Sequence, residues 1–98
     1  MTRRVVVRAA AKRDIREARA WYSGISRALG DDVIAAIDEA IARATEYPEA
    51  FPVVRQGFRR VLLRRFPYAL FYVLRDDRLI VAAVLHQARD PFLLDRRR

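Results

Sequence analysis

The fold is decided by residues 79–85, which read LIVAAVL. This short apolar run is rich in β-branched residues, which is typical of a strand. Alternate side chains of a strand point to opposite faces, and here both faces are apolar. We therefore expect the strand to be central in its sheet, or its second face to be covered by another segment. In a regular strand, Leu79, Val81, Ala83 and Leu85 face one side, and Ile80, Ala82 and Val84 face the other.

Further strands are predicted on either side of a polar turn at residues 75–78, RDDR. Tyr68–Leu74 is rich in aromatic residues and forms a hairpin with the 79–85 strand. Arg59–Arg65 reads as one more strand, and Pro48–Gly57 as a loop or a ragged edge. Near the N-terminus, Arg4–Arg8 contains three consecutive valines and predicts a fourth strand.

Two amphipathic helices are expected between the first strand and Pro48. From about Ala11, apolar residues recur every three or four positions, and Gly30 is predicted to end this helix. The second helix runs from about Asp32 to Glu46, before Tyr47-Pro48. So short a link predicts an antiparallel helical hairpin. The apolar stripe of the first helix comprises Ile15, Ala18, Tyr22, Ile25 and Leu29.

The predicted order is β-α-α-β-β-β, an α+β fold with the helical hairpin packed on a small, mostly antiparallel sheet. Its 98 residues predict a single domain over 1–98, with a basic tail at about 94–98 that we expect to be frayed. No apolar run is long enough to span a bilayer and no secretory signal is recognisable, so we expect a cytoplasmic protein that does not enter a membrane.

Composition narrows the chemistry of any site. The chain has no cysteine and one histidine, which excludes disulfides, thiolate metal sites and histidine-rich metal sites, and we expect no metal and no cofactor. The net charge of +8 lies outside the helical segment, because residues 9–47 carry 6 bases and 7 acids. Such a field attracts nucleic acid or an acidic peptide. A plain nucleic-acid-binding module is disfavoured, since the helical segment carries −1.

Short motifs follow one another in a fixed order along nearly the whole chain. The most specific is residues 84–91, VLHQARDP, at the end of the last strand. In order and spacing the motifs resemble those of RelE/ParE-type toxins of type II toxin–antitoxin systems, and are closer to ParE-like members. The others are Ala18, Trp21-Tyr22, Leu29-Gly30, Pro48-Glu49, residues 59–63, Phe66-Pro67-Tyr68 and Phe71-Tyr72.

This resemblance implies the same fold and a growth-inhibiting toxin, as in plasmid stabilization systems. It implies a cognate acidic antitoxin, ParD-like or similar, whose partly disordered tail lies over the toxin. Operator DNA would be reached only through the antitoxin complex. ParE-like members poison DNA gyrase, whereas RelE-like members cut messenger RNA on the ribosome. We expect gyrase poisoning, which is not a hydrolytic activity, with ribosome-dependent endoribonuclease activity as the alternative.

A ribonuclease would need a base and cations around the phosphate. His86 is the candidate base, and Arg64, Arg65 and Arg89 are the candidate cations. The competing interpretation of His86 is a hydrogen bond to loop backbone at the end of the strand. Many RelE-type enzymes have a tyrosine shortly after the last strand, where this chain has Phe92, which cannot exchange a proton. Messenger RNA cleavage is therefore the second choice.

Binding residues are predicted around the Arg59–Arg65 strand. Its four bases can contact gyrase, receive carboxylates of the antitoxin, or merely protect a solvated strand edge. Trp21, at the edge of its helical stripe, and Phe92 are candidate apolar anchors for a partner. The four bases are Arg59, Arg60, Arg64 and Arg65.

Overall fold

The computed structural model describes residues 3–97 as an α+β fold, which confirms the predicted class. The sheet has five strands in the order β1-β5-β4-β3-β2, and only β1 pairs in parallel. A short strand, β2, and a 3₁₀ helix, η1, are additional to the predicted elements. The elements are β1 (Arg4–Val7), α1 (Ala9–Ser23), α2 (Arg27–Glu46), β2 (Val53–Arg55), β3 (Phe58–Leu62), β4 (Tyr68–Arg75), β5 (Arg78–His86) and η1 (Pro91–Arg96).

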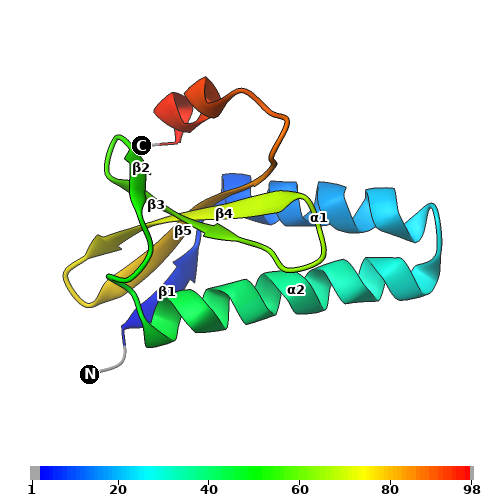
Figure 1. Cartoon of the computed structure of the whole chain (residues 1–98), viewed down its shortest axis with the longest axis horizontal. Coiled ribbons are helices and arrows are strands. Elements are labelled where there is room, and N and C mark those ends of the chain that lie inside the picture. The colour runs from blue at the N-terminus through cyan, green and yellow to red at the C-terminus, as the bar shows by residue number, and fades with distance from the viewer. Residues whose placement is uncertain (1–2, 98) are drawn as a thin grey trace.

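The sheet is the middle of three layers, with the two helices against one face and η1 over the other (Figure 1). The larger core lies on the helical side, where Val33, Ile37 and Ala40 of α2 meet the inner residues of β4 and β5. A smaller core lies on the η1 side, where Leu94 packs with Phe58 and Phe71. Both faces of β5 are therefore covered, as its sequence required.

A β-bulge in β5 changes the predicted alternation of that strand. Phe71 pairs with Ala83 but Tyr72 pairs with Val81, so Ala82 is an extra residue. Ala82 and Ala83 both lie in the core on the η1 side, whereas Val81 and Val84 both lie on the helical side. The prediction that Ala83 shares a face with Val81 was wrong, because two small residues in sequence give no sign of which strand position is doubled.

One ion pair stabilises the bulge. β1 ends at Val7 opposite Val81, so beyond this point β5 has no neighbouring strand on that side. The Asp14 carboxylate accepts a hydrogen bond from the Val84 N–H at 3.0 Å, and Arg97 donates to the Ala82 carbonyl at 2.9 Å. Asp14 and Arg97 also bind each other at 2.8 Å, and both are largely buried. Side chains from α1 and the C-terminus thus replace the missing strand.

The C-terminal residues do not form the expected frayed tail. Leu94 is buried, Arg55 binds the Asp95 carboxylate through two hydrogen bonds, and Arg97 binds Asp14. Composition suggested a loose basic end, but one apolar residue and two ionic contacts bind the segment across the sheet. Arg98 lies outside the described residues.

The turn of the helical hairpin also differs from the prediction. α1 ends at Ser23 and α2 begins at Arg27, so Gly30 lies inside α2 and Ile25 is exposed in the turn. Ser26 caps α2 by accepting a hydrogen bond from the Leu29 N–H at 3.1 Å. Gly30 lets α2 approach α1 closely, because a Cβ there would lie 3.1 Å from Ser23 Cβ and 3.3 Å from Ser23 Cα.

Replacing Asp14 with alanine should destabilise the fold by about 2–4 kcal/mol, because Val84 N–H and the Arg97 guanidinium would lose a shared, largely buried partner. Urea denaturation followed by circular dichroism measures this change. Glu17→Ala, at an exposed position on the same helix, is the control and should cost less than about 0.5 kcal/mol. Equal effects of the two substitutions would contradict the bridging role.

Candidate functional site

A groove runs along the sheet face that η1 only partly covers. Its volume is about 510 Å³, and it lies between the outer face of β3–β5 and η1. Strand alternation and the β5 bulge determine which side chains reach it. The lining residues are Val54, Arg55, Arg60, Leu62, Ala69, Phe71, Leu85, His86, Gln87, Arg89 and Leu94.

The floor of the groove is apolar. Leu62 of β3, Phe71 of β4 and Leu85 of β5 lie on the same face of the sheet, with Ala69 between them. Leu62 is 47% exposed, which is unusual for a leucine in a paired strand. Val54 of β2 extends the apolar surface at the open edge. Such a surface binds a partner's apolar side chains by the hydrophobic effect.

The rim of the groove is cationic. Arg60 and Arg89 are exposed, and neither forms an ion pair with any residue between 3 and 97. Arg55 is held in place instead, because its guanidinium binds Asp95 and lies 4.1 Å from the centroid of the Phe92 ring. The hydrogen bonds that Arg55 donates to the Asp95 carboxylate raise the pKa of Arg55. Arg60 and Arg89 are thus the cations available to an incoming anion.

The predicted arginines fall into different environments. Arg60 lines the groove, but Arg59 points to the helical side and donates to the backbone carbonyls of Glu49 and Phe51, at 3.2 and 2.7 Å. Arg64 and Arg65 follow β3, which ends at Leu62 and not at Arg65 as predicted.

Arg65 has a left-handed φ of 74°, which an extended strand cannot contain. Its guanidinium lies 3.1 Å from Asp32, and that of Arg64 lies 3.8 Å from Glu39. These two arginines therefore face α2, whereas Arg60 and Arg89 face the groove.

His86 has a structural contact that matches the loop-capping interpretation. Its Nδ1 accepts a hydrogen bond from the Ala88 N–H at 3.0 Å, and its ring packs edge-on against Tyr68 at 5.3 Å. The groove brings His86 and Arg89 together, but Arg64 and Arg65 are not among its lining residues. Burial raises the pKa of Tyr68, so its phenol stays protonated at neutral pH and is not a general base. Of the four candidate catalytic residues, the groove therefore contains two.

The two predicted apolar anchors are both open to solvent. Phe92 is 60% exposed beside Arg55, and Trp21 is 69% exposed. Trp21 lines a smaller pocket of about 210 Å³, which it shares with His86 and Arg89. The two pockets share Leu85, His86 and Arg89 as lining residues, so Trp21 lies close to the groove.

Sequence reasoning missed Leu62, Arg55 and Asp95. Leu62 was detectable, because it alternates with Arg60 and therefore shares its face. The Arg55–Asp95 contact joins residues 40 positions apart, and no local pattern predicts it. Among residues 3–97, no group of three or more His, Cys, Asp or Glu side chains has a geometry that could hold a metal ion. No helix within this range is long and apolar enough to cross a membrane.

Comparison with known proteins identifies the family. The model of the ParE toxin of type II toxin–antitoxin systems, parDE, matches residues 5–91. The chain belongs to the ParE toxin family. Its fold is similar to that of a chain in a solved structure described as the chromosomal ParDE TA system from P. aeruginosa, with a TM-score of 0.77 and 13% identity over 87% of this chain and 96% of that one. No curated protein matches the sequence.

The stability of this ParE-family chain at alkaline pH should depend on the phenol of Tyr72. Tyr72 is fully buried and donates to the Pro48 carbonyl at 2.7 Å, and burial raises its pKa above 10.0. The neutral phenol is therefore favoured by folding, and this contribution is lost as the pH rises through the folded pKa. Urea denaturation from pH 8 to about 11.5 should show stability falling less steeply for Tyr72→Phe than for the wild type. Parallel curves would contradict the assignment.

Proposed function

We propose that this ParE-family toxin is neutralised in the cytoplasm by an antitoxin whose acidic, amphipathic segment occupies the groove. The observation that carries the proposal is the combination of an apolar groove, exposed at Leu62 and Val54, with two cations that lack an ionic partner on the described chain. Apolar side chains of the antitoxin would cover Leu62 and Phe71. Its carboxylates would bind Arg60 and Arg89 by charge-assisted hydrogen bonds.

We further propose that DNA gyrase is the target and that the toxin acts by binding. The residues that a ribonuclease would use support this choice. Arg64 and Arg65 lie near acids of α2 and do not line the groove, and His86 already accepts a loop hydrogen bond. Phe92, which cannot transfer a proton, stands on η1 beside the groove. A binding surface of apolar and cationic groups remains, which suits a protein target.

Leu62→Glu should weaken the antitoxin complex by about 30- to 100-fold, since it places a carboxylate on the apolar floor opposite an acidic segment. The probe is the acidic product of the reading frame beside the toxin gene, and calorimetry measures the dissociation constant. Val53→Glu is the matched control, because Val53 is an exposed strand residue that does not line the groove. Equal affinity of the wild type and Leu62→Glu would contradict this docking site.

His86→Asn should leave growth arrest unchanged, because asparagine retains an acceptor for the Ala88 N–H. Loss of a general base would lower a cleavage rate by about 10²- to 10⁴-fold. Plasmid supercoiling and protein synthesis are recorded after induction at matched protein levels. Supercoiling should fail first in both forms. If protein synthesis fails first, and only with the wild type, the chain is a ribonuclease and not a gyrase poison.

A further inference from the structure

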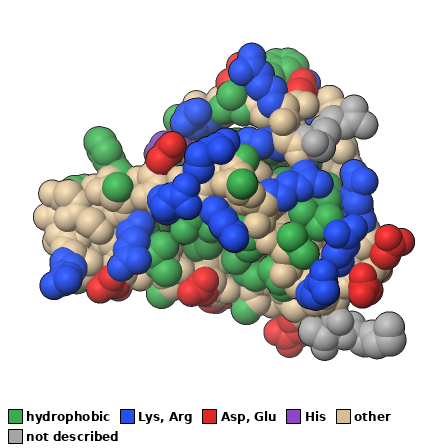
Figure 2. Space-filling view, turned by 180° about the vertical axis from the view of Figure 1, so that it is seen from behind, with side chains coloured by type: hydrophobic (Ala, Val, Ile, Leu, Met, Phe, Trp, Pro, Cys, Tyr) green, Lys and Arg blue, Asp and Glu red, His purple; other side chains and the backbone are tan. Residues whose placement is uncertain are grey.

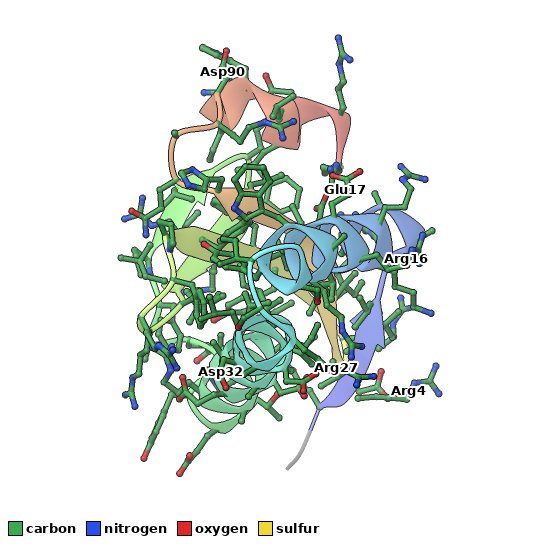
Figure 3. The ribbon with its side chains drawn as sticks, turned by 90° about the vertical axis from the view of Figure 1, so that its right-hand side faces the viewer. Arg4, Arg16, Glu17, Arg27, Asp32 and Asp90 are labelled. Atoms are coloured by element: carbon green, nitrogen blue, oxygen red, sulfur yellow. The ribbon has the colours of Figure 1, made fainter. Side chains whose placement is uncertain are left out.

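The basic and acidic residues of α1 lie on opposite flanks of the helix. At about 100° per residue, the four bases fall within an arc of about 120°. Asp14 and Glu17 lie on the other flank, where Asp14 binds Arg97 and Glu17 lies on the side of η1 (Figure 3). The net charge of −1 over residues 9–47 is therefore unevenly distributed, and one flank of α1 is a cationic surface. The four bases are Lys12, Arg13, Arg16 and Arg19.

This flank continues onto the neighbouring elements. Arg4 of β1 and Arg27 of α2 lie on the same side of the molecule as Arg16 (Figure 3). From behind, Lys and Arg side chains are spread across the face of the molecule, with most acidic side chains toward its edges (Figure 2). We call this surface the α1 band. It consists of Arg4, Lys12, Arg13, Arg16, Arg19 and Arg27.

Most of the band has no internal counterion. Arg19 binds Asp31 at 3.3 Å, and both side chains of that pair are exposed by more than half. Its other five members are exposed and form no ion pair with residues 3–97. Holding like charges side by side destabilises a small domain unless an anion neutralises them. The band is also distinct from the groove, which η1 and β3–β5 form.

The chemistry of the band fits a phosphodiester backbone. On α1 the side chains between these cations are small, Ala9, Ala20 and Ser23, and include no aromatic ring. Beyond α1, Val5 and Ile25 are exposed near Arg4 and Arg27, but they lie on different segments of the chain and form no apolar stripe. An acidic amphipathic peptide or a membrane would need such a stripe, and the apolar face of α1 is buried in the core. Single strands are bound by aromatic stacking, which the band cannot offer. Duplex phosphates need only cations and hydrogen-bond donors.

We propose that the α1 band binds the backbone of duplex DNA without sequence preference. The band follows the long axis of the molecule, which is 39 Å, and one turn of B-DNA is about 34 Å. The choice of DNA over duplex RNA rests on the proposed gyrase target, whose substrate is duplex DNA. The band holds the toxin against DNA while the groove and η1 remain open to a protein.

Fluorescence anisotropy with a labelled 20-base-pair duplex over a range of salt concentrations tests the proposal. Five phosphate contacts give a slope of log K against log salt between about −4 and −5. The triple variant Lys12→Gln, Arg13→Gln, Arg16→Gln should reduce this slope by about 3 and weaken binding more than about tenfold at 50 mM salt. Circular dichroism verifies that the variant is folded.

A second triple variant, Arg60→Gln, Arg89→Gln, Arg96→Gln, removes the same charge from exposed positions outside the band. It should retain DNA binding and lose affinity for the acidic antitoxin, whereas the band variant should do the reverse. Equal loss of DNA binding in both triples would show diffuse attraction and overturn the proposal. Tighter binding of duplex RNA, polyglutamate or phosphatidylserine vesicles than of DNA would overturn the assigned partner. If the wild-type protein binds duplex DNA but does not inhibit gyrase, only the proposed gyrase target is refuted.

Discussion

The Asp14–Arg97 ion pair is the contact on which the rest of the architecture depends. It joins α1 to the C-terminus across the open side of β5, and it binds two backbone groups of β5 that have no strand partner beyond the end of β1. A buried backbone group without a partner costs about as much as a lost hydrogen bond. The bulge, the path of the C-terminus and the position of η1 are therefore coupled. Desolvation of the two charged groups opposes folding. The hydrogen bonds between Asp14 and Arg97, and those that each forms with the backbone of β5, offset that cost.

The position of η1 in turn shapes the groove. Leu94 covers part of the second sheet face and Asp95 fixes Arg55, so the apolar lining of the groove is exposed mainly at Leu62 and Val54. Without η1 the whole face would be exposed, which favours aggregation. With it, the remaining apolar surface is narrow and has cations beside it. A partner must then supply both apolar and anionic groups, and this double requirement gives specificity.

The fold was largely predictable, because its causes are local. The valines of β1, the stripe of α2 and the RDDR turn each determine their own element. The bulge at Ala82 and the docking of η1 depend on contacts between distant residues and were missed. The hairpin turn was also missed, although the Ser26 cap that begins α2 is a local contact with Leu29. The candidate site was predicted less well. The structure places Arg60 and Arg89 at the groove, with Trp21 and Phe92 exposed near it, whereas Arg59 contacts backbone carbonyls and Arg64 and Arg65 lie beside acids of α2.

Charge was the least predictable property, because a count along the sequence does not resolve the flanks of a helix. Lys12 and Asp14 are two residues apart, yet they lie about 160° apart around α1. Asp14 forms a largely buried ion pair with Arg97, whereas Lys12 is exposed and can bind an anion. The groove and the α1 band also lie on different surfaces, so the protein can bind two partners at the same time. An antitoxin that fills the groove therefore need not displace an anion from the band.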